Sequence, residues 1–198
     1  MTKLMLDLGG VAIRTPFEML AHVGDPPWRG PFDPERDHLW QALQRSEITE
    51  RDYWRTRARE LHQGEDSLRE FFRQVLDHPE EIVVCPEIAQ FLAEVESPAA
   101  LTNDMSAFHS EEWVERMTLL RRFDPLIDLS AEPYLKPDPR AFDYALSELG
   151  LPADEVLFVD DQPFNLRGAE AVGMWTEWFD VTDVDASIVR IKKALDDD

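Results

Sequence analysis

Short apolar runs that end at polar residues alternate with longer segments of helical periodicity along most of this chain. The first run covers residues 3–8 and is followed by two glycines, which predicts a short buried strand and a turn. Four later runs predict further strands: 99–101, 126–129, 155–159 and 174–178. Because strands alternate with helices, we expect an α/β fold with a doubly wound parallel sheet.

Apolar residues recur at helical spacing between the first two predicted strands. Three segments show this spacing with no strand between them: 34–45, 49–62 and 66–77. Thr49 followed by Asp52 resembles a capping box at the start of the second segment. This stretch is too long for a simple crossover. It therefore predicts an inserted, small α-helical cap over residues 15–81 and a core formed by residues 1–14 and 82–198.

Residues 16–34 precede these helices and are rich in glycine and proline, which predicts a mostly irregular loop. We expect its part at 26–31 to contact substrate, since it lies close to the first predicted strand. Further helices are predicted at 87–95, 111–122, 139–149, 164–172 and 184–195. Asp138, Pro139 and Gly150 cap, begin and end the third of these.

Acidic residues outnumber basic residues by 41 to 20, which gives the 198-residue chain a net charge of −21. Such a charge repels a phosphate backbone and argues against nucleic acid as a partner. If the substrate is a small anion, its site must contain local cations, either a metal ion or a buried lysine.

Cys85 is the only cysteine, which excludes an intrachain disulfide and a zinc cluster of thiolates. The N-terminal apolar run is too short for a secretory signal. No segment approaches the roughly 20 apolar residues needed to cross a bilayer. We therefore expect a cytoplasmic protein without a membrane partner, either a monomer or a homodimer.

Polar residues stand at the ends of three predicted strands, where ligands bind in an open α/β sheet. Asp7 ends the first strand, Thr102 the second, and Asp160 with Asp161 the fourth. Lys136 lies in a loop just before a helix. Each residue alone fits a turn, a cap or the surface. Together they predict one site that combines carboxylates, a hydroxyl and an ammonium group.

Four segments resemble the motifs of the haloacid dehalogenase superfamily of phosphohydrolases, in the subgroup with a small helical cap after the first motif. The matching runs are LMLDLGGV, ALTND, LKPDPRAF and VLFVDDQPFNLRGAEAVGM. The last run, with its DDxxxN pattern, is the most specific. The resemblance implies a Rossmann-like core and Mg²⁺-dependent hydrolysis of a small phosphorylated metabolite. It gives sugar phosphates as the leading substrate class.

The resemblance also implies a nucleophile and a metal site. Asp7 would attack phosphorus and form an aspartyl-phosphate, which divides hydrolysis into two easier displacements. Mg²⁺ would be held by Asp7, Asp161 and the backbone carbonyl of Gly9. Asp160 would be an additional or water-mediated ligand.

Other motif residues would bind the phosphoryl group and arrange the site. By resemblance, Thr102 and Asn103 would hold phosphoryl oxygens through a hydroxyl and nearby backbone amides. Lys136 would offset charge on Asp7 and on the phosphoryl group. Asn165 would orient Lys136 or an acidic ligand.

Gly9 departs from the pattern of the family. Most phosphatases of the family carry a second aspartate at this position, which protonates the leaving oxygen and later activates water. General acid–base catalysis of this kind contributes about 10²–10⁴-fold. With only a glycine there, the metal ligand is kept and the acid–base group is lost.

Three interpretations of the glycine remain open. The first is an active phosphatase whose leaving group needs little protonation or whose acid comes from elsewhere. Sugar-1-phosphate phosphatases of the family also read D-x-G, which favours it. The second is a 2-haloacid dehalogenase. That chemistry needs no Mg²⁺, so the Asp160–Asp161 pair argues against it. The third is a catalytically weak protein that binds a phosphorylated ligand or a partner.

Several other residues have both a functional and an ordinary interpretation. Asp104 is a conceivable substitute acid, although a helix cap is its more ordinary role. Arg14 can reach a substrate or form a loop salt bridge, and His109 follows the second motif. One helical face carries three arginines that we expect in solvent: Arg51, Arg55 and Arg59. The aromatic residues expected mainly in the cap core are Trp28, Trp40, Trp54, Phe71 and Phe72.

Overall fold

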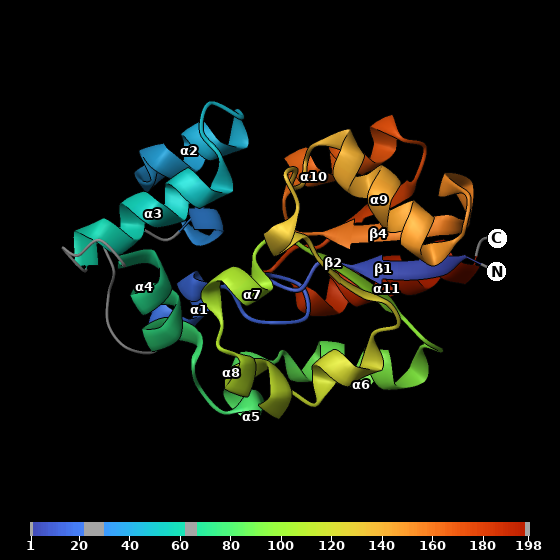
Figure 1. Cartoon of the computed structure of the whole chain (residues 1–198), viewed down its shortest axis with the longest axis horizontal. Helices are drawn as coiled ribbons and strands as arrows, with labels where there is room; N and C mark the ends of the chain where they lie inside the picture. The colour runs from blue at the N-terminus through green and yellow to red at the C-terminus, as the bar shows by residue number, and fades with distance from the viewer. Residues whose placement is uncertain (1, 22–29, 62–66, 197–198) are drawn as a thin grey trace.

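The computed structural model describes residues 2–21, 30–61 and 67–196 (Figure 1). Its sheet has five parallel strands: β1 (Lys3–Leu6), β2 (Ala99–Thr102), β3 (Leu126–Asp128), β4 (Val156–Asp160) and β5 (Trp175–Trp178). Their order is β3-β2-β1-β4-β5. The chain extends the sheet first on one side of β1 and later on the other, as in doubly wound folds. The predicted parallel α/β fold is confirmed.

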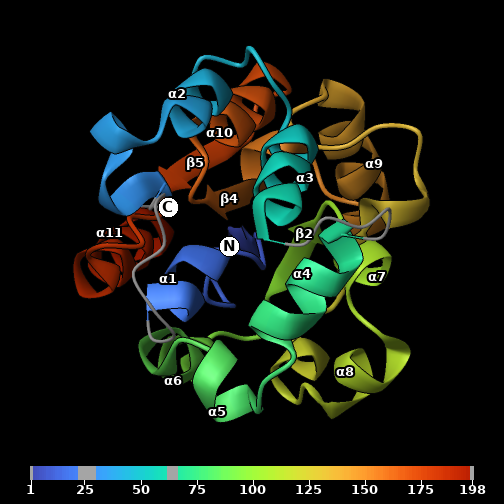
Figure 2. The ribbon, with the colours of Figure 1, turned by 90° about the vertical axis from the view of Figure 1, so that its left-hand side faces the viewer.

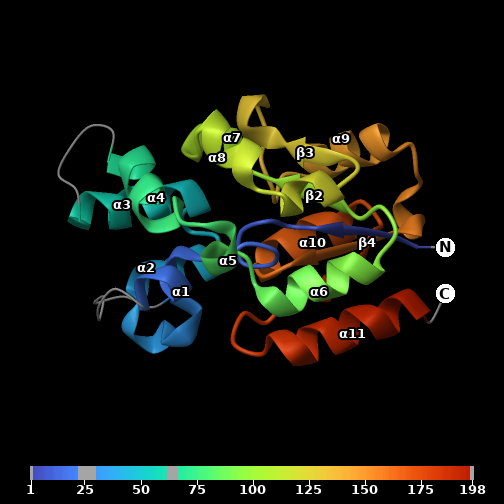
Figure 3. The ribbon, with the colours of Figure 1, turned by 90° about the horizontal axis from the view of Figure 1, so that it is seen from below.

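Helices cover both faces of the sheet (Figures 1 and 3). The four helices that do so are α6 (Pro86–Glu94), α9 (Pro139–Leu149), α10 (Pro163–Ala171) and α11 (Val184–Asp196). Leu4 and Leu6 of β1 belong to the core beneath α6 and α11. Met5, which points to the other face, belongs to the core beneath α9 and α10. Both faces of β1 are apolar because parallel strands are buried on both sides.

Helices between β1 and α6 lie mainly beyond the carboxyl ends of the strands (Figures 1 and 2). They are α1 (Pro16–Ala21), the 3₁₀ helices η1 (Gly30–Phe32) and η2 (Pro34–Arg36), α2 (His38–Gln44), α3 (Glu50–Leu61), α4 (Ser67–Leu76) and α5 (Glu80–Val83). The stretch predicted as irregular, 16–34, therefore begins with a helix. Most of the predicted substrate loop at 26–31, including Trp28, lies outside the described residues.

Aromatic side chains form a core within these helices, as the sequence predicts. Neighbouring ring centroids lie 4.9 to 5.9 Å apart among Phe17, Trp40, Tyr53, Trp54, Phe71 and Phe72. The predicted pairing of Thr49 with Asp52 at the start of α3 is present as well. The Thr49 hydroxyl donates to the Asp52 carboxylate at 2.7 Å and accepts from the Asp52 amide at 3.1 Å.

Asp37 is fully buried beside this aromatic core. It divides the helix predicted at 34–45, because its carboxylate accepts the Trp40 amide at 2.8 Å and caps α2. The same carboxylate accepts the Gly30 amide at 3.3 Å and the Tyr53 hydroxyl at 2.7 Å. It also forms an ion pair with Arg57, which is 8% exposed. One carboxylate thus joins η1, α2 and α3.

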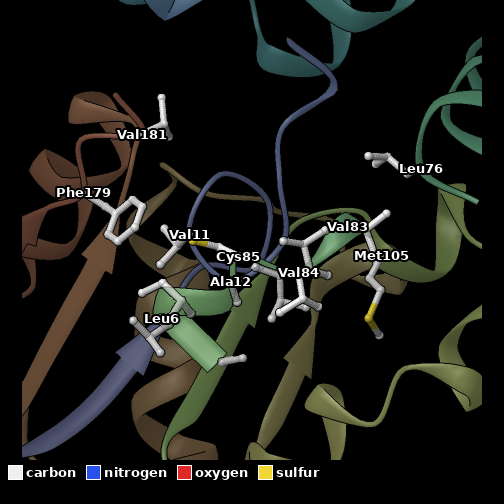
Figure 4. Packing of buried hydrophobic residues seen from close by; sticks show 14 of the residues in the cluster. Leu6, Val11, Ala12, Leu76, Val83, Val84, Cys85, Met105, Phe179 and Val181 are labelled. Atoms are coloured by element: carbon white, nitrogen blue, oxygen red, sulfur yellow. The ribbon is translucent and has the colours of Figure 1, made fainter. Parts of the chain in front are cut away.

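Apolar side chains pack around the turn after β1 (Figure 4). Val11 and Ala12 belong to the same core as Val83 and Val84, and Ile13 forms a bridge with Val84. The Arg14 amide donates to the Val83 carbonyl at 2.7 Å, so the chain segments that enter and leave the helices are paired. This pairing anchors the helices on the turn that carries the first motif.

The remaining elements follow the predicted pattern with two differences. The helix predicted at 111–122 is divided into α8 (Glu111–Arg116) and η3 (Leu119–Arg122). β5, predicted as a core strand, is an edge strand whose Trp175 is 62% exposed. Three further short helices are present: α7 (Met105–Phe108) after β2, η4 (Leu129–Ala131) after β3 and η5 (Ala153–Glu155) before β4.

Candidate active site

The ends of β1 and β4 and one loop bring oppositely charged groups together. Lys136 Nζ lies 2.9 Å from Asp7 Oδ1 and 2.9 Å from Asp160 Oδ2. The lysine is 4% exposed and Asp160 is fully buried. Despite burial, which opposes the charge, Asp160 and Asp7 raise the pKa of Lys136. The ammonium is therefore held in its charged form between two carboxylates.

Asp160 is fixed by hydrogen bonds from α10 and from the turn before it. The side-chain amide of Asn165 donates to both carboxylate oxygens at 3.1 Å, and the Gln162 backbone amide donates at 2.8 Å. Asn165 is fully buried. It contacts the acidic residue rather than Lys136, the other partner that the sequence suggested.

Asp161 joins the same cluster. One carboxylate oxygen from each of Asp7, Asp160 and Asp161 lies within 4.8 Å of the others. Burial, followed by repulsion between the carboxylates, raises the pKa of Asp7 to about 7 and raises that of Asp161. Three carboxylates and one ammonium leave an excess of negative charge, which a divalent cation would offset. The donor atoms are all oxygens, a set that suits Mg²⁺. The residues present therefore fit the metal that the resemblance implies.

Thr102 is the last residue of β2 and Asn103 follows it, on the side of β1 opposite β4. Thr102 is 8% exposed and lines the cavity above the strand ends. The side chain of Asn103 pairs with the backbone of Lys136: its Oδ1 accepts the amide at 2.8 Å and its Nδ2 donates to the carbonyl at 3.2 Å. Asn103 thus positions the lysine loop, a contact that sequence spacing alone does not reveal.

A cavity of about 110 Å³ opens over Asp7. Its floor includes Asp7, Thr102, Lys136 and Asp161. Its walls come largely from the helices beyond the strand ends and from the segment after β2: Glu50, Arg51, Trp54, Phe72, Phe108, His109 and Trp113. The cavity therefore joins a polar, charged floor to mostly aromatic walls.

Two polar contacts beside the cavity connect α2 and α3 to the segments that follow β4 and β2. Arg51 of α3 forms an ion pair with Asp104 in the loop after β2. Gln44 of α2 donates to the Gln162 side chain at 3.0 Å. Arg51 is therefore not simply part of a solvated face, and the Asp104 side chain makes no capping hydrogen bond to α7. Arg14 forms the loop salt bridge that was its ordinary interpretation, with Glu18 at 3.4 Å.

His109 stacks on Trp113 in the cavity wall, with ring centroids 3.8 Å apart. Burial lowers the pKa of His109 to about 4, although the charges of Asp77 and Asp128 oppose that shift. The folded state therefore favours the neutral ring. Its contribution to stability is complete above the pKa of about 6.5 in the unfolded chain and is lost as pH falls toward 4.

Replacing His109 by Phe keeps a stacked ring and removes this titration. On lowering the pH from 7 to 4, we expect the free energy of unfolding of the variant, relative to that of the wild type, to rise by up to about 3 kcal/mol. Urea denaturation of both proteins at several pH values measures this difference. The contributions of the carboxylates are the same in both proteins and cancel. A difference independent of pH would show that the ring is not held neutral.

Comparison with known proteins identifies the family. A family model described as haloacid dehalogenase-like hydrolase matches residues 20–173, which is more than half of the chain. This range holds the second, third and fourth motifs. The chain belongs to the haloacid dehalogenase-like hydrolases.

Curated relatives of this hydrolase include phosphatases. A phosphoserine phosphatase of Thermus thermophilus is 33% identical over 159 residues, which cover 77% of this chain and 56% of that protein. A phosphoglycolate phosphatase of Pseudomonas savastanoi is 30% identical over 115 residues, covering 56% of this chain and 42% of that protein. Acyl-CoA dehydrogenase family member 10 of Mus musculus is 35% identical over 95 residues, covering 48% of this chain and 9% of that protein. The hydrolase thus spans at most 56% of these relatives' length.

Solved structures share the fold at lower identity. A hydrolase from Pseudomonas syringae has a TM-score of 0.62 at 16% identity, with 99% of this chain and 98% of that chain covered. A dehalogenase in an intermediate complex has a TM-score of 0.60 at 18% identity, with 91% and 85% covered. Among the described residues of this hydrolase, no helix is long and apolar enough to span a bilayer.

Proposed function

We propose that this hydrolase cleaves small phosphomonoesters through an aspartyl-phosphate on Asp7. The observation that supports this most is the Lys136 ammonium, which lies 2.9 Å from both Asp7 and Asp160 beneath an open cavity. Such a lysine can offset the charge of a carboxylate nucleophile and of a phosphoryl group beside it. The phosphatase relatives agree with this reaction.

Each residue of the site has a distinct role in this reaction. Asp7 Oδ attacks phosphorus, while Lys136 offsets the charge that gathers on the phosphoryl oxygens. The Thr102 hydroxyl, at the end of the neighbouring strand, donates to one of these oxygens. Asn103 and Asn165 act through other residues: the first holds the backbone of Lys136 and the second holds the Asp160 carboxylate.

We propose that Asp7, Asp161 and the Gly9 carbonyl hold Mg²⁺, with Asp160 as a further or water-mediated ligand. When bound, the ion supplies positive charge that favours phosphate in the site. The acidic cluster favours this reaction over dehalogenation, which needs no cation. We retain residues 15–81 as the cap of the enzyme and residues 1–14 and 82–198 as its core.

Gly10 provides a test of the acidic cluster. Its φ is +84°, and a Cβ there would lie 2.6 Å from Asp161 Cγ and 2.7 Å from both carboxylate oxygens. We expect Gly10→Ala to displace Asp161 and weaken Mg²⁺ binding by about 10–100-fold, as measured by titration calorimetry. Gly150→Ala is the matched control, since Gly150 also has a positive φ but nothing within 4 Å of its Cβ position. Equal Mg²⁺ affinity in the two variants would remove Asp161 from the metal site.

The substrate class rests on the cavity and on the relatives. A volume of about 110 Å³ suits a small leaving group. Sugar phosphates, the class that the resemblance implies, belong in the test beside phosphoserine and phosphoglycolate. We further propose that the enzyme works in the cytoplasm, as a monomer or a homodimer, since its single cysteine is free.

A panel of phosphomonoesters, assayed with Mg²⁺ and with EDTA, tests the function. We expect phosphate release that needs the metal. Chloride release from a 2-haloacid without metal would identify a dehalogenase instead. Binding of Mg²⁺ and of a phosphate analogue without turnover of any substrate would identify a catalytically weak binding protein.

A further inference from the structure

Four carboxylates of the described residues line the cavity: Asp7, Glu50, Asp104 and Asp161. The proposed function uses Asp7 as nucleophile and Asp161 as a cation ligand. Asp104, the substitute acid suggested by the sequence, is engaged in an ion pair with Arg51. Glu50 is the carboxylate that has no role so far.

Glu50 is the first residue of α3, and the N-terminal end of this helix lies nearer the sheet than its C-terminal end (Figure 1). Three contacts fix that end. The capping box holds the backbone before Glu50, and Arg51 ties the helix to the loop after β2. One turn later, Trp54 Nε1 donates to Glu50 Oε1 at 3.4 Å. The glutamate is therefore held in the wall that faces Asp7.

Gly9 leaves open the position where the acid of the family usually stands. A Cβ placed on Gly9 meets no described atom within 4 Å beyond its chain neighbours, so a side chain could begin there without a clash. The other ionisable groups of the cavity are unsuitable donors. Lys136 is held charged between two carboxylates, Arg14 and Arg51 are engaged in ion pairs with Glu18 and Asp104, and His109 is stacked and neutral.

We propose that Glu50 is the general acid and general base of this enzyme, supplied by α3 in place of the aspartate absent at Gly9. The proposal rests on the phosphatase function proposed above. Burial and the charge of Asp7 raise the pKa of Glu50 to about 7, which makes a protonated carboxyl available near neutral pH.

The proton balance of the two steps is complete. In the first, Asp7 Oδ bonds to phosphorus, the bond from phosphorus to the leaving oxygen breaks, and the Glu50 carboxyl gives that oxygen its proton. In the second, the Glu50 carboxylate takes a proton from water. The water oxygen then bonds to phosphorus and the bond from phosphorus to Asp7 breaks. One ester and one water become one alcohol and one phosphate.

Glu50→Gln separates these steps when leaving groups of different acidity are compared. For alkyl phosphates, which need protonation, we expect kcat/KM to fall by about 10²–10⁴-fold. For an aryl phosphate with an acidic phenol, kcat/KM should hardly change, because it reports the first step. Its kcat should still fall as hydrolysis of the aspartyl-phosphate loses its base. A burst of phenol, equal to the enzyme concentration, marks that change.

Two variants complete the experiment. Glu47→Gln is the matched control, since Glu47 is an exposed carboxylate three residues earlier, paired with exposed Arg45. It should match the wild type on every substrate. Adding Gly9→Asp to Glu50→Gln places a carboxyl at the usual position, where space is available. We expect this second change to restore kcat/KM for alkyl phosphates.

The outcomes distinguish the two proposals. Equal losses for alkyl and aryl phosphates, unchanged rates, or a higher KM alone would overturn the role of Glu50 while leaving the phosphatase intact. Failure of Gly9→Asp to restore a variant that remains folded by circular dichroism would also count against it. A wild type that releases phosphate from no ester would overturn both proposals.

Discussion

Replacing Asp7 by Asn is expected to abolish phosphate release while the protein stays folded. The carboxylate oxygen that attacks phosphorus becomes an amide, and the ion pair with Lys136 at 2.9 Å is lost. Removing the nucleophile of a covalent mechanism lowers kcat by about 10⁴-fold or more. Asparagine has the shape of aspartate, so thermal unfolding followed by circular dichroism should show a native transition.

A neutral change elsewhere controls for the loss of one acidic charge. Asp143 is an exposed aspartate on α9, away from the cavity, and Asp143→Asn should keep wild-type kcat and KM. Metal-dependent phosphate release that survives in Asp7→Asn would exclude Asp7 as the nucleophile.

The largest loss of stability is expected from Asp37→Asn. The four contacts that described residues make to the Asp37 carboxylate all come from donors, so the amide nitrogen of an asparagine would face a donor. Buried Arg57 would lose its interior counter-charge and keep Glu60, which lies nearer the surface. Breaking a buried ion pair on one side costs about 3–5 kcal/mol. We expect the melting temperature to fall by about 10 °C.

Two comparisons identify the cause of that loss. Glu47→Gln breaks the exposed pair with Arg45 and should hardly change the free energy of unfolding. Adding Arg57→Met to Asp37→Asn removes the unbalanced charge and should recover part of the stability. The cost of Arg57→Met alone is measured in the wild type. If Arg57→Met lowers the stability of Asp37→Asn by the same amount, the two residues do not act as a pair.

The alternation of strands and helices is enough to predict the parallel sheet, because each buried strand is a short apolar run bounded by turn residues. The caps at Thr49 and Asp138 are predicted for the same local reason. The helix break at Asp37 could not be predicted from local sequence in this way. Asp37 ends η2 and begins α2 because Tyr53 and Arg57, distant in sequence, bury its carboxylate. β5 begins and ends with tryptophan, which suggested a core strand, yet it lies at an edge of the sheet because of the strand order.

The motif residues of the site can also be found from sequence, since strand ends in a parallel sheet meet at one edge. The structure brings Asp7, Lys136, Asp160 and Asp161 together at that edge. Glu50 and Gln44 cannot be found in this way. They reach the cavity and the Gln162 side chain through the packing of α2 and α3 over the sheet, and neither belongs to a motif.

The most direct test of the account is to locate the phosphoryl group during turnover. The enzyme, mixed with a substrate labelled in its phosphoryl group, is quenched in acid within one turnover and digested, and the labelled peptide is sequenced by mass spectrometry. We predict one labelled site, the carboxylate of Asp7. A label on any other residue, or full substrate turnover with no labelled protein at any quench time, would contradict it.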